Sequence, residues 1–193
     1  MASLLTELFN DLGAVFNRTS AQWYVFGAQA AIVHGAARLT ADVDITVMLG
    51  NQPIENLIQV LKEEGFEVCV SDVLILVEHS RVLPVIHSKS SIPVDIVLGG
   101  PGLEEQFMQR AQQHDLDGVM VPIASSEDVI AMKILAGREK DLDDALAIIM
   151  AQGKRLELLT IRLRLELLEK ALDRSDLLLT LDELVHRGNT SET

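Results

Sequence analysis

The sequence is poor in cysteine and in aromatic residues, and it contains no long apolar run. Cys69 is the single cysteine among 193 residues, which excludes an intramolecular disulfide and fits a reducing compartment. No apolar stretch is long enough to cross a bilayer, and no basic residues precede the first apolar ones. We therefore expect a cytoplasmic protein with no membrane span and no signal peptide.

Basic residues are also scarce relative to acidic ones, with 16 Lys and Arg against 29 Asp and Glu and a formal net charge of −13. A generally acidic surface disfavours non-specific binding to nucleic acid. Hydrophobic residues make up 48% of the chain, which is enough for a packed core and excludes a disordered protein. The length suits one domain, or a small domain with a helical appendage.

Residues 22–48 carry the most informative pattern, which predicts a strand, a glycine turn, a short helix and a second strand. Trp23–Phe26 are aromatic and β-branched, as in a buried strand. Gly27 permits a sharp turn, and the alanine-rich residues 28–37 favour a helix directly after it. Apolar and polar residues then alternate over residues 43–48, which indicates a strand with one buried face.

That alternation predicts that Asp42 and Asp44 share one face of a strand, about 7 Å apart. Asp95 is the one charge inside the apolar run 92–98, and a buried carboxylate is costly unless it is paired or bound to metal. Hard carboxylate oxygens suit magnesium, and free backbone N–H groups at the Gly27 turn suit phosphate. This pattern is what the handling of a nucleoside triphosphate with magnesium requires.

Gly27-Ala28, a short helix and then Arg38-x-Thr40-x-Asp42-x-Asp44 resemble the signature of the DNA polymerase β-like nucleotidyltransferase superfamily. Within it, the pattern is most similar to the AbiEii-like group of type IV toxin–antitoxin systems. The sequence departs from the family at Ala28, where many members carry serine or glycine, so a hydroxyl contact to phosphate is lost while the backbone N–H groups remain.

A second block, residues 133–144, is open to two interpretations. On spacing alone, Lys133, Asp141 and Asp144 fall on nearly one face of a continuous helix over residues 126–144. The first interpretation is therefore an exposed stripe of ion pairs, which contributes little to stability. The block is also similar to the second conserved block of the AbiEii-like group. There the lysine is associated with nucleotide phosphate and the aspartates with the catalytic pocket.

The resemblance implies a Mg²⁺-dependent enzyme that uses a nucleoside triphosphate such as ATP as co-substrate. It implies two magnesium ions, held by the catalytic carboxylates of Asp42, Asp44 and Asp95. It further implies nucleotide-binding residues at Gly27, Ala28, Thr40, Lys133 and Asp141.

The expected fold is α+β: a small mixed β-sheet nucleotidyltransferase core flanked by helices, with a C-terminal helical subdomain. The composition changes near residue 124 from β-rich to helical, so we predict a core over residues 1–123 and a helical subdomain over residues 124–193. The remaining patterns predict helices over 3–16, 54–64, 103–113, 154–173 and 177–185, strands over 66–70 and 119–123, a hairpin of 73–77 with 82–86, a turn over 114–118, and a helix cap at Ser125.

Three functions remain open from the sequence. The first is transfer of a nucleotidyl group to an acceptor hydroxyl on a tRNA end, a protein or a small molecule such as an antibiotic. The second is a glycosyltransferase that uses Asp-x-Asp to hold a nucleotide-sugar, although the glycine turn is unexplained by it. The third is a non-catalytic protein that keeps the fold and binds an antitoxin or another protein.

Overall fold

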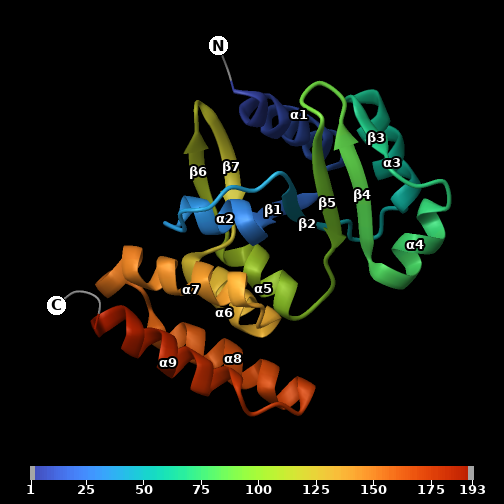
Figure 1. Ribbon diagram of the computed structural model, residues 1–193. Coiled ribbons are helices and arrows are strands. Elements are labelled where there is room, and N and C mark those ends of the chain that lie inside the picture. The colour runs from blue at the N-terminus through green and yellow to red at the C-terminus, as the bar shows by residue number, and fades with distance from the viewer. Residues whose placement is uncertain (1–2, 191–193) are drawn as a thin grey trace. The chain divides into compact units, whose positions relative to one another are not determined.

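The computed structural model describes residues 3–190 and confirms the predicted α+β class, with helices and a mixed seven-stranded sheet (Figure 1). The described chain divides into two compact units. The sheet unit comprises residues 3–26 and 40–124, and the helical unit comprises residues 27–39 and 125–190. The second unit thus contains an early segment of the chain, residues 27–39, besides the C-terminal helices.

The sheet has the strand order β3-β4-β5-β2-β1-β7-β6. The central strand β2 pairs antiparallel with β1 and parallel with β5, so the sheet is mixed (Figure 1). Its strands are β1 (Gln22–Phe26), β2 (Val43–Met48), β3 (Phe66–Val68), β4 (Val82–His87), β5 (Ile92–Leu98), β6 (Gln112–Leu116) and β7 (Val119–Ile123).

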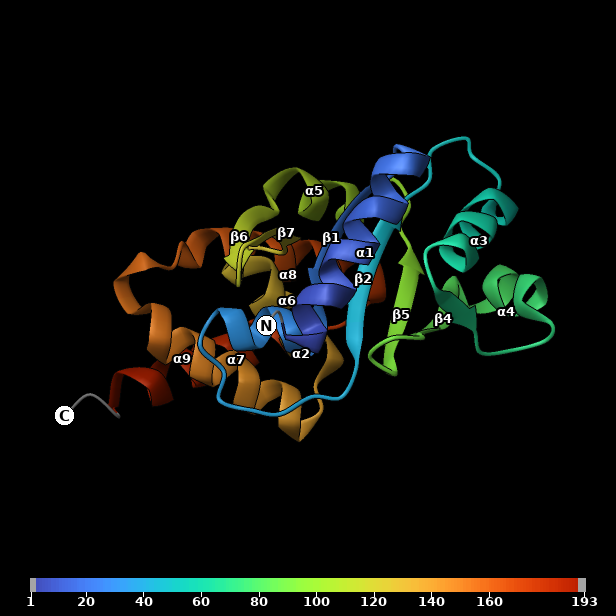
Figure 2. The same ribbon diagram turned by 90° about the horizontal axis from the view of Figure 1, so that it is seen from above.

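Helices of the sheet unit pack against its strands. They are α1 (Leu4–Thr19), α3 (Ile54–Glu63), α4 (Val73–Ser80) and α5 (Leu103–Arg110). The predicted amphipathic first helix is confirmed, because Leu8, Leu12 and Phe16 of α1 are buried. Helices α1 and α3 contact each other. Both are seen from above in Figure 2. His87 Nε2 of β4 lies 3.1 Å from Asp11 Oδ2, so α1 covers the sheet face to which His87 belongs.

Alternation along the strands then decides which face each side chain takes. Val43, Ile45 and Val47 of β2 are fully buried. Val94 of β5 lies in register with Val43 of β2 on one side and with Val85 of β4 on the other. Since successive side chains of a strand point to opposite faces, Val85 and His87 share the face under α1. Val43 and Val94 share that face as well, because Val94 is in register with both Val43 and Val85. Asp44 and Asp95 alternate with these residues, so they belong to the opposite face.

The helical unit packs an apolar core of its own, which includes Ile134, Ile148, Ile161, Leu165 and Leu181. Ser125 caps α6 by accepting a hydrogen bond of 3.2 Å from the Asp128 N–H, which confirms the predicted cap. The elements of this unit are α2 (Gly27–Val33), α6 (Ser126–Ala136), α7 (Glu139–Gln152), the 3₁₀ turn η1 (Gly153–Arg155), α8 (Leu158–Leu172) and α9 (Leu177–Thr190).

Two predicted elements of the sheet unit are wrong. Residues 73–77 form part of helix α4 and not one arm of a hairpin, and β4 pairs instead with β5. Five consecutive apolar residues carry neither helical nor strand period, so the pattern cannot distinguish the two. Residues 112–116, expected as a helix end and a turn, form the edge strand β6, whose polar side chains hid it.

Two predicted helices of the helical unit are too long. The helix expected over residues 28–37 ends at Val33, because the chain turns at His34 and Gly35. The helix expected to continue over residues 126–144 breaks at Gly137, which adopts a left-handed φ of +66° and ends α6. Glycine tolerates that conformation without a steric penalty, so it terminates helices readily.

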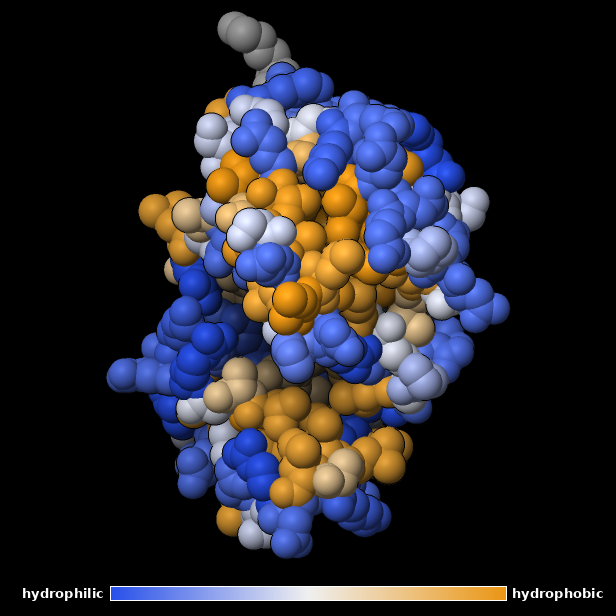
Figure 3. Space-filling model, turned by 90° about the vertical axis from the view of Figure 1, so that its right-hand side faces the viewer, coloured by the Kyte–Doolittle hydropathy of each residue, from blue (hydrophilic) through white to orange (hydrophobic). Residues whose placement is uncertain are grey.

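Apolar side chains remain exposed on the sheet unit, and Figure 3 shows apolar surface gathered among hydrophilic side chains on that side of the molecule. The exposed apolar residues there include Val70, Leu74, Ile75, Leu76 and Ile86. A groove of about 500 Å³ borders them, lined chiefly by residues of α3, of β3 and of the segment between β3 and α4. In the part of the chain that the structure describes, no helix combines the length and the apolar character that crossing a membrane requires.

Candidate active site

Two of the three predicted catalytic carboxylates lie side by side on the sheet. Asp44 of β2 and Asp95 of β5 are in direct register on neighbouring parallel strands. Strands in a sheet are about 4.8 Å apart, so the two backbones bring these carboxylates close together. Both residues are half-buried, and both belong to the face opposite α1.

Asp42, the third carboxylate, is exposed and lies just before β2 begins. It accepts a hydrogen bond from the Thr40 hydroxyl, which places the predicted nucleotide-binding residue Thr40 directly beside a predicted metal ligand. Burial, and then the negative charge of Asp42, raise the pKa of Asp95 above its ordinary value. A like charge disfavours ionisation only when it is near, so the carboxylate of Asp42 lies close enough to act on Asp95.

A divalent cation fits this site in donor chemistry. All three groups supply hard carboxylate oxygens, which magnesium prefers. Across residues 3–190, however, no three His, Cys, Asp or Glu side chains are gathered as a ready-made metal centre. The chemical type of these three residues and their positions on the strands thus suit a magnesium site. Their side chains are not gathered around one point, and mutual repulsion between the carboxylates would keep them apart.

Cys69 is a neighbour of this site that the sequence did not indicate. Its backbone N–H donates a hydrogen bond of 3.1 Å to the carbonyl of Pro84, which is in register with Asp95. Burial, and then the charges of Asp95 and Glu67, raise the pKa of the Cys69 thiol. No sequence signal could have found it, because the contact depends on the pairing of three strands.

Gly27 and Ala28 begin helix α2 in the helical unit. Gly27 has a φ of +66°, which confirms the turn that a β-carbon would disfavour. The preceding residue, Phe26, ends β1 in register with Asp44. Whether the N–H groups of this turn hold phosphate stays a prediction.

Lys133 lies within the helical unit and is enclosed by carboxylates. Its Nζ is 2.8 Å from Asp141 Oδ1 and 2.7 Å from Asp144 Oδ2. Asp144 Oδ2 also accepts from Arg38 Nη1 at 2.7 Å, and Asp141 Oδ2 accepts from Arg138 Nε. Because α6 ends at Ala136, α7 folds back to bring its aspartates to Lys133, and the exposed stripe expected from a continuous helix is wrong.

Arg38 and Arg138 belong to this network, although the sequence patterns predicted a binding role for neither. Arg38 stands in the first motif, ahead of Thr40 and Asp42. Its ion pair joins the two sequence blocks through Asp144. Burial raises the pKa of Asp141, but hydrogen bonds from Arg138 and then Lys133 outweigh it, so the pKa is lowered overall.

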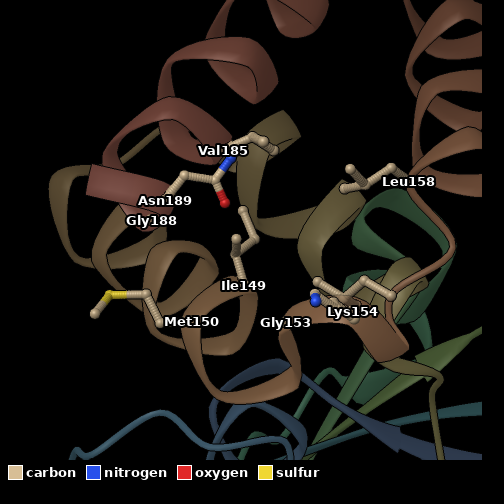
Figure 4. Close-up of a pocket in the computed structure, with 9 residues that line it drawn as sticks. Ile149, Met150, Gly153, Lys154, Leu158, Val185, Gly188 and Asn189 are labelled. Atoms are coloured by element: carbon tan, nitrogen blue, oxygen red, sulfur yellow. The ribbon is translucent and has the colours of Figure 1, made fainter. Parts of the chain in front are cut away.

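The helical unit also contains a pocket of about 410 Å³, which Figure 4 shows in close-up. None of the predicted site residues lines it. Its walls come from the end of α7, from η1, from the start of α8 and from the end of α9, through residues such as Ile149, Lys154 and Val185.

Solved structures similar to this chain include one described as an adenylyltransferase and one described as nucleotidyltransferase-like. ANT(2″)-Ia in complex with adenylyl-2″-tobramycin is 12% identical with a TM-score of 0.56, over 81% of this chain and 94% of that one. The lincosamide antibiotic adenylyltransferase LnuA, lincomycin-bound, is 17% identical with a TM-score of 0.51, over 74% and 94%. An antigenic nucleotidyltransferase-like protein from Paracoccidioides brasiliensis is 19% identical with a TM-score of 0.54, over 91% and 90%. At these identities the likeness shows the fold alone.

A search of curated proteins finds no match. The sequence family described as "Nucleotidyltransferase of unknown function (DUF6036)" matches residues 3–181. This match supports the nucleotidyltransferase superfamily that the motifs indicated, without singling out the AbiEii-like group. The chain belongs to the DUF6036 family of nucleotidyltransferases.

Proposed function

We propose that this chain transfers a nucleotidyl group from a nucleoside triphosphate to an acceptor hydroxyl and releases pyrophosphate. The observation that carries the proposal is the register pair of Asp44 and Asp95 on parallel strands, with Asp42 near enough to shift the pKa of Asp95. Two carboxylates on neighbouring strands and a third at the strand start form the donor set that such chemistry needs.

Asp42, Asp44 and Asp95 are the residues that would hold divalent cations. Bound cations would neutralise charge on the phosphates and favour attack at the α-phosphorus. Asp95 would accept the proton of the attacking hydroxyl, since burial and then the charge of Asp42 raise its pKa and so make it a better base than an ordinary carboxylate. The acceptor oxygen forms its bond to the α-phosphorus as the bond to the departing pyrophosphate breaks.

The remaining predicted site residues have binding roles in this proposal. Backbone N–H groups at Gly27 and Ala28 would take the outer phosphates, as at other helix starts that follow a glycine turn. Thr40 would orient Asp42, with which it shares a hydrogen bond. Lys133 and Asp141 would contribute to nucleotide binding from the helical unit.

We propose a small molecule as the acceptor, in preference to a tRNA end or a protein. On β3, β4 and β5, the positions on the same face as Asp95 include Glu67, Pro84, Ile86 and Pro93. None of these four is basic, so they offer no attraction to the phosphate backbone of a tRNA. The structural neighbours described with adenylyl-tobramycin and with lincomycin agree with a small acceptor.

The experiment is a transfer assay with each α-³²P-labelled nucleoside triphosphate, Mg²⁺, and tobramycin, lincomycin or purified tRNA as separate acceptors. Label in a small-molecule product, lost on Asp44→Asn and on addition of EDTA, supports the proposal. Label in tRNA would overturn the acceptor class, and it would favour the toxin–antitoxin role that the AbiEii-like resemblance implies.

A non-catalytic binding protein is the second candidate. Ala28 favours this candidate because it lacks the hydroxyl that many family members offer to phosphate at that position. A second observation in its favour is that Asp42, Asp44 and Asp95 are not gathered as a metal centre within residues 3–190. Nucleotide binding measured by calorimetry, with no transfer to any acceptor at enzyme concentrations equal to those of substrate, would support this candidate over the first.

A further inference from the structure

Arg38 offers a second kind of anion contact, which the motifs did not assign. It lies between α2 and β2, within the helical unit, and its side chain is 25% exposed. One corner of its guanidinium is held, because Nη1 donates to Asp144 Oδ2 at 2.7 Å. Within residues 3–190 the side chain of Arg38 makes no other hydrogen bond. The edge formed by Nε and Nη2 therefore retains donors for a ligand.

Lys133 differs from Arg38 in this respect, although both donate to the same oxygen of Asp144. The Lys133 side chain is only 8% exposed, and Asp141 and Asp144 together take two of its hydrogen bonds. Its charge is thus compensated inside the unit. Of the two cations on Asp144 Oδ2, Arg38 is the one that a ligand in solvent can reach.

The network also gathers positive side chains in one place. Lys133, Arg38 and Arg138 all pair with the carboxylates of Asp141 and Asp144. Such a gathering of cations is notable in a chain of net charge −13. An arginine fixed at one corner by a carboxylate and open at the other suits bidentate recognition of a phosphate group.

The backbone that carries Arg38 is fixed as well. Gln152 Nε2 donates to the carbonyl of His34 at 2.9 Å. Gly35 packs so closely on α7 that a β-carbon there would stand 2.3 Å from the Ala151 Cβ. The segment ahead of Arg38 is therefore anchored on α7, and little conformational entropy would be lost when Arg38 binds a ligand.

We propose that Arg38 binds a phosphate group of the nucleoside triphosphate, and that Lys133, Asp141 and Asp144 are positioning residues that hold its guanidinium. The inference rests on the proposed function, because it names the ligand as the triphosphate of that reaction. It assigns Lys133 a supporting role: the ammonium group fixes Asp144, and Asp144 fixes Arg38.

The test uses tripolyphosphate alone as the probe, measured by isothermal titration calorimetry with the full chain. Arg38→Gln should weaken binding about tenfold or more, and Arg38→Lys should not restore it, because an ammonium lacks the planar fork. Arg174→Gln is the matched control, since Arg174 is an arginine of the same unit that pairs with the exposed Asp176, and it should bind as wild type. Thermal melting of each variant verifies folding.

A second variant separates positioning from simple charge. Asp144→Asn removes a negative charge, which on Coulombic grounds alone would tighten anion binding. The proposed positioning role instead predicts weaker binding, because Arg38 loses its anchor. Tighter tripolyphosphate binding by a folded Asp144→Asn, or wild-type binding by Arg38→Gln, overturns the inference, as does no binding by the wild type.

The transfer assay distinguishes this inference from the proposed function. If wild-type protein transfers label while Arg38→Gln binds tripolyphosphate unchanged, the inference is wrong and the transferase stands. If Arg38 is needed for tripolyphosphate binding but no acceptor is ever labelled, the phosphate site stands and the transferase is wrong.

Discussion

Arg38 and Asp144 are 106 residues apart in the sequence and are joined by an ion pair of 2.7 Å. The first of these residues opens the motif that contains Asp42 and Asp44, and the second ends the block that begins with Lys133. The pair therefore links the two parts of the sequence that carry the family resemblance. Asp144 Oδ2 also accepts from Lys133, so the same oxygen joins a loop residue to two successive helices.

Asp95→Asn should abolish nucleotidyl transfer while making the protein more stable. Removing a metal-binding base should cost about 100-fold or more in rate. Burial and then Asp42 raise the pKa of Asp95 in the folded protein. The stability that protonated Asp95 contributes is therefore complete below its unfolded pKa of about 3.9, and it is lost as the pH rises through the folded pKa. At pH 7 a neutral amide should then raise the melting temperature, measured in EDTA. Asp72→Asn, an exposed control, should change neither quantity.

Lys133→Met should destabilise the protein severely. The substitution leaves Asp141 and Asp144 buried without the cation they share, and breaking a buried pair in this way costs about 3–5 kcal/mol. Urea unfolding at pH 7 measures the loss. Lys154→Met, at an exposed lysine, should stay within about 0.5 kcal/mol of wild type. Equal stability of the two variants would contradict a buried ion-pair network.

Asp141→Asn should be destabilising in a pH-dependent way. Burial raises the pKa of Asp141, but the hydrogen bonds from Arg138 and Lys133 lower it by more than burial raises it. The folded pKa of Asp141 therefore lies below the unfolded one. Such a group contributes stability above the unfolded pKa of about 3.9 and loses it as the pH falls through the folded value. The stability difference between wild type and variant should therefore be largest near neutral pH and shrink in acid. Asp143→Asn, its exposed neighbour, should show no such trend.

Gly35→Ala and Gly13→Ala should have opposite effects on stability. Gly35 has a φ of +119°, and its added β-carbon would meet the Ala151 Cβ at 2.3 Å, so we expect a loss of about 2 kcal/mol or more. Gly13 lies in α1 with open space around the position of a β-carbon. Alanine there should gain about 0.5–1 kcal/mol in the free energy of unfolding. Chemical denaturation of both variants provides the measurement.

The strands that carry the carboxylates could be predicted because their sequence has a clear period. Val43, Ile45 and Val47 alternate with polar residues, and β2 follows that pattern. Asp95 was recognisable as one charge within an apolar run. The register of Asp44 against Asp95 could not be predicted, since the pairing of two parallel strands depends on the whole sheet rather than on either strand's own residues.

The network around Lys133 shows where local reasoning fails. Spacing on one continuous helix grouped Lys133 with Asp141 and Asp144, and they do meet, but through two helices separated by Gly137. Arg38 reaches them from a segment with no regular structure, for which neither helical nor strand period gives a signal. Such a contact becomes visible only when the backbone is known.

The division of the chain also has a consequence for its synthesis. Residues 27–39 belong with helices that leave the ribosome only after residues 40–124 have been translated. At the usual elongation rates this delay is roughly 4 to 17 s. During that interval α2 and Arg38 have none of the partners that they contact in the finished helical unit. A fragment that begins at residue 125 would carry the complementary defect, because it lacks the early segment altogether.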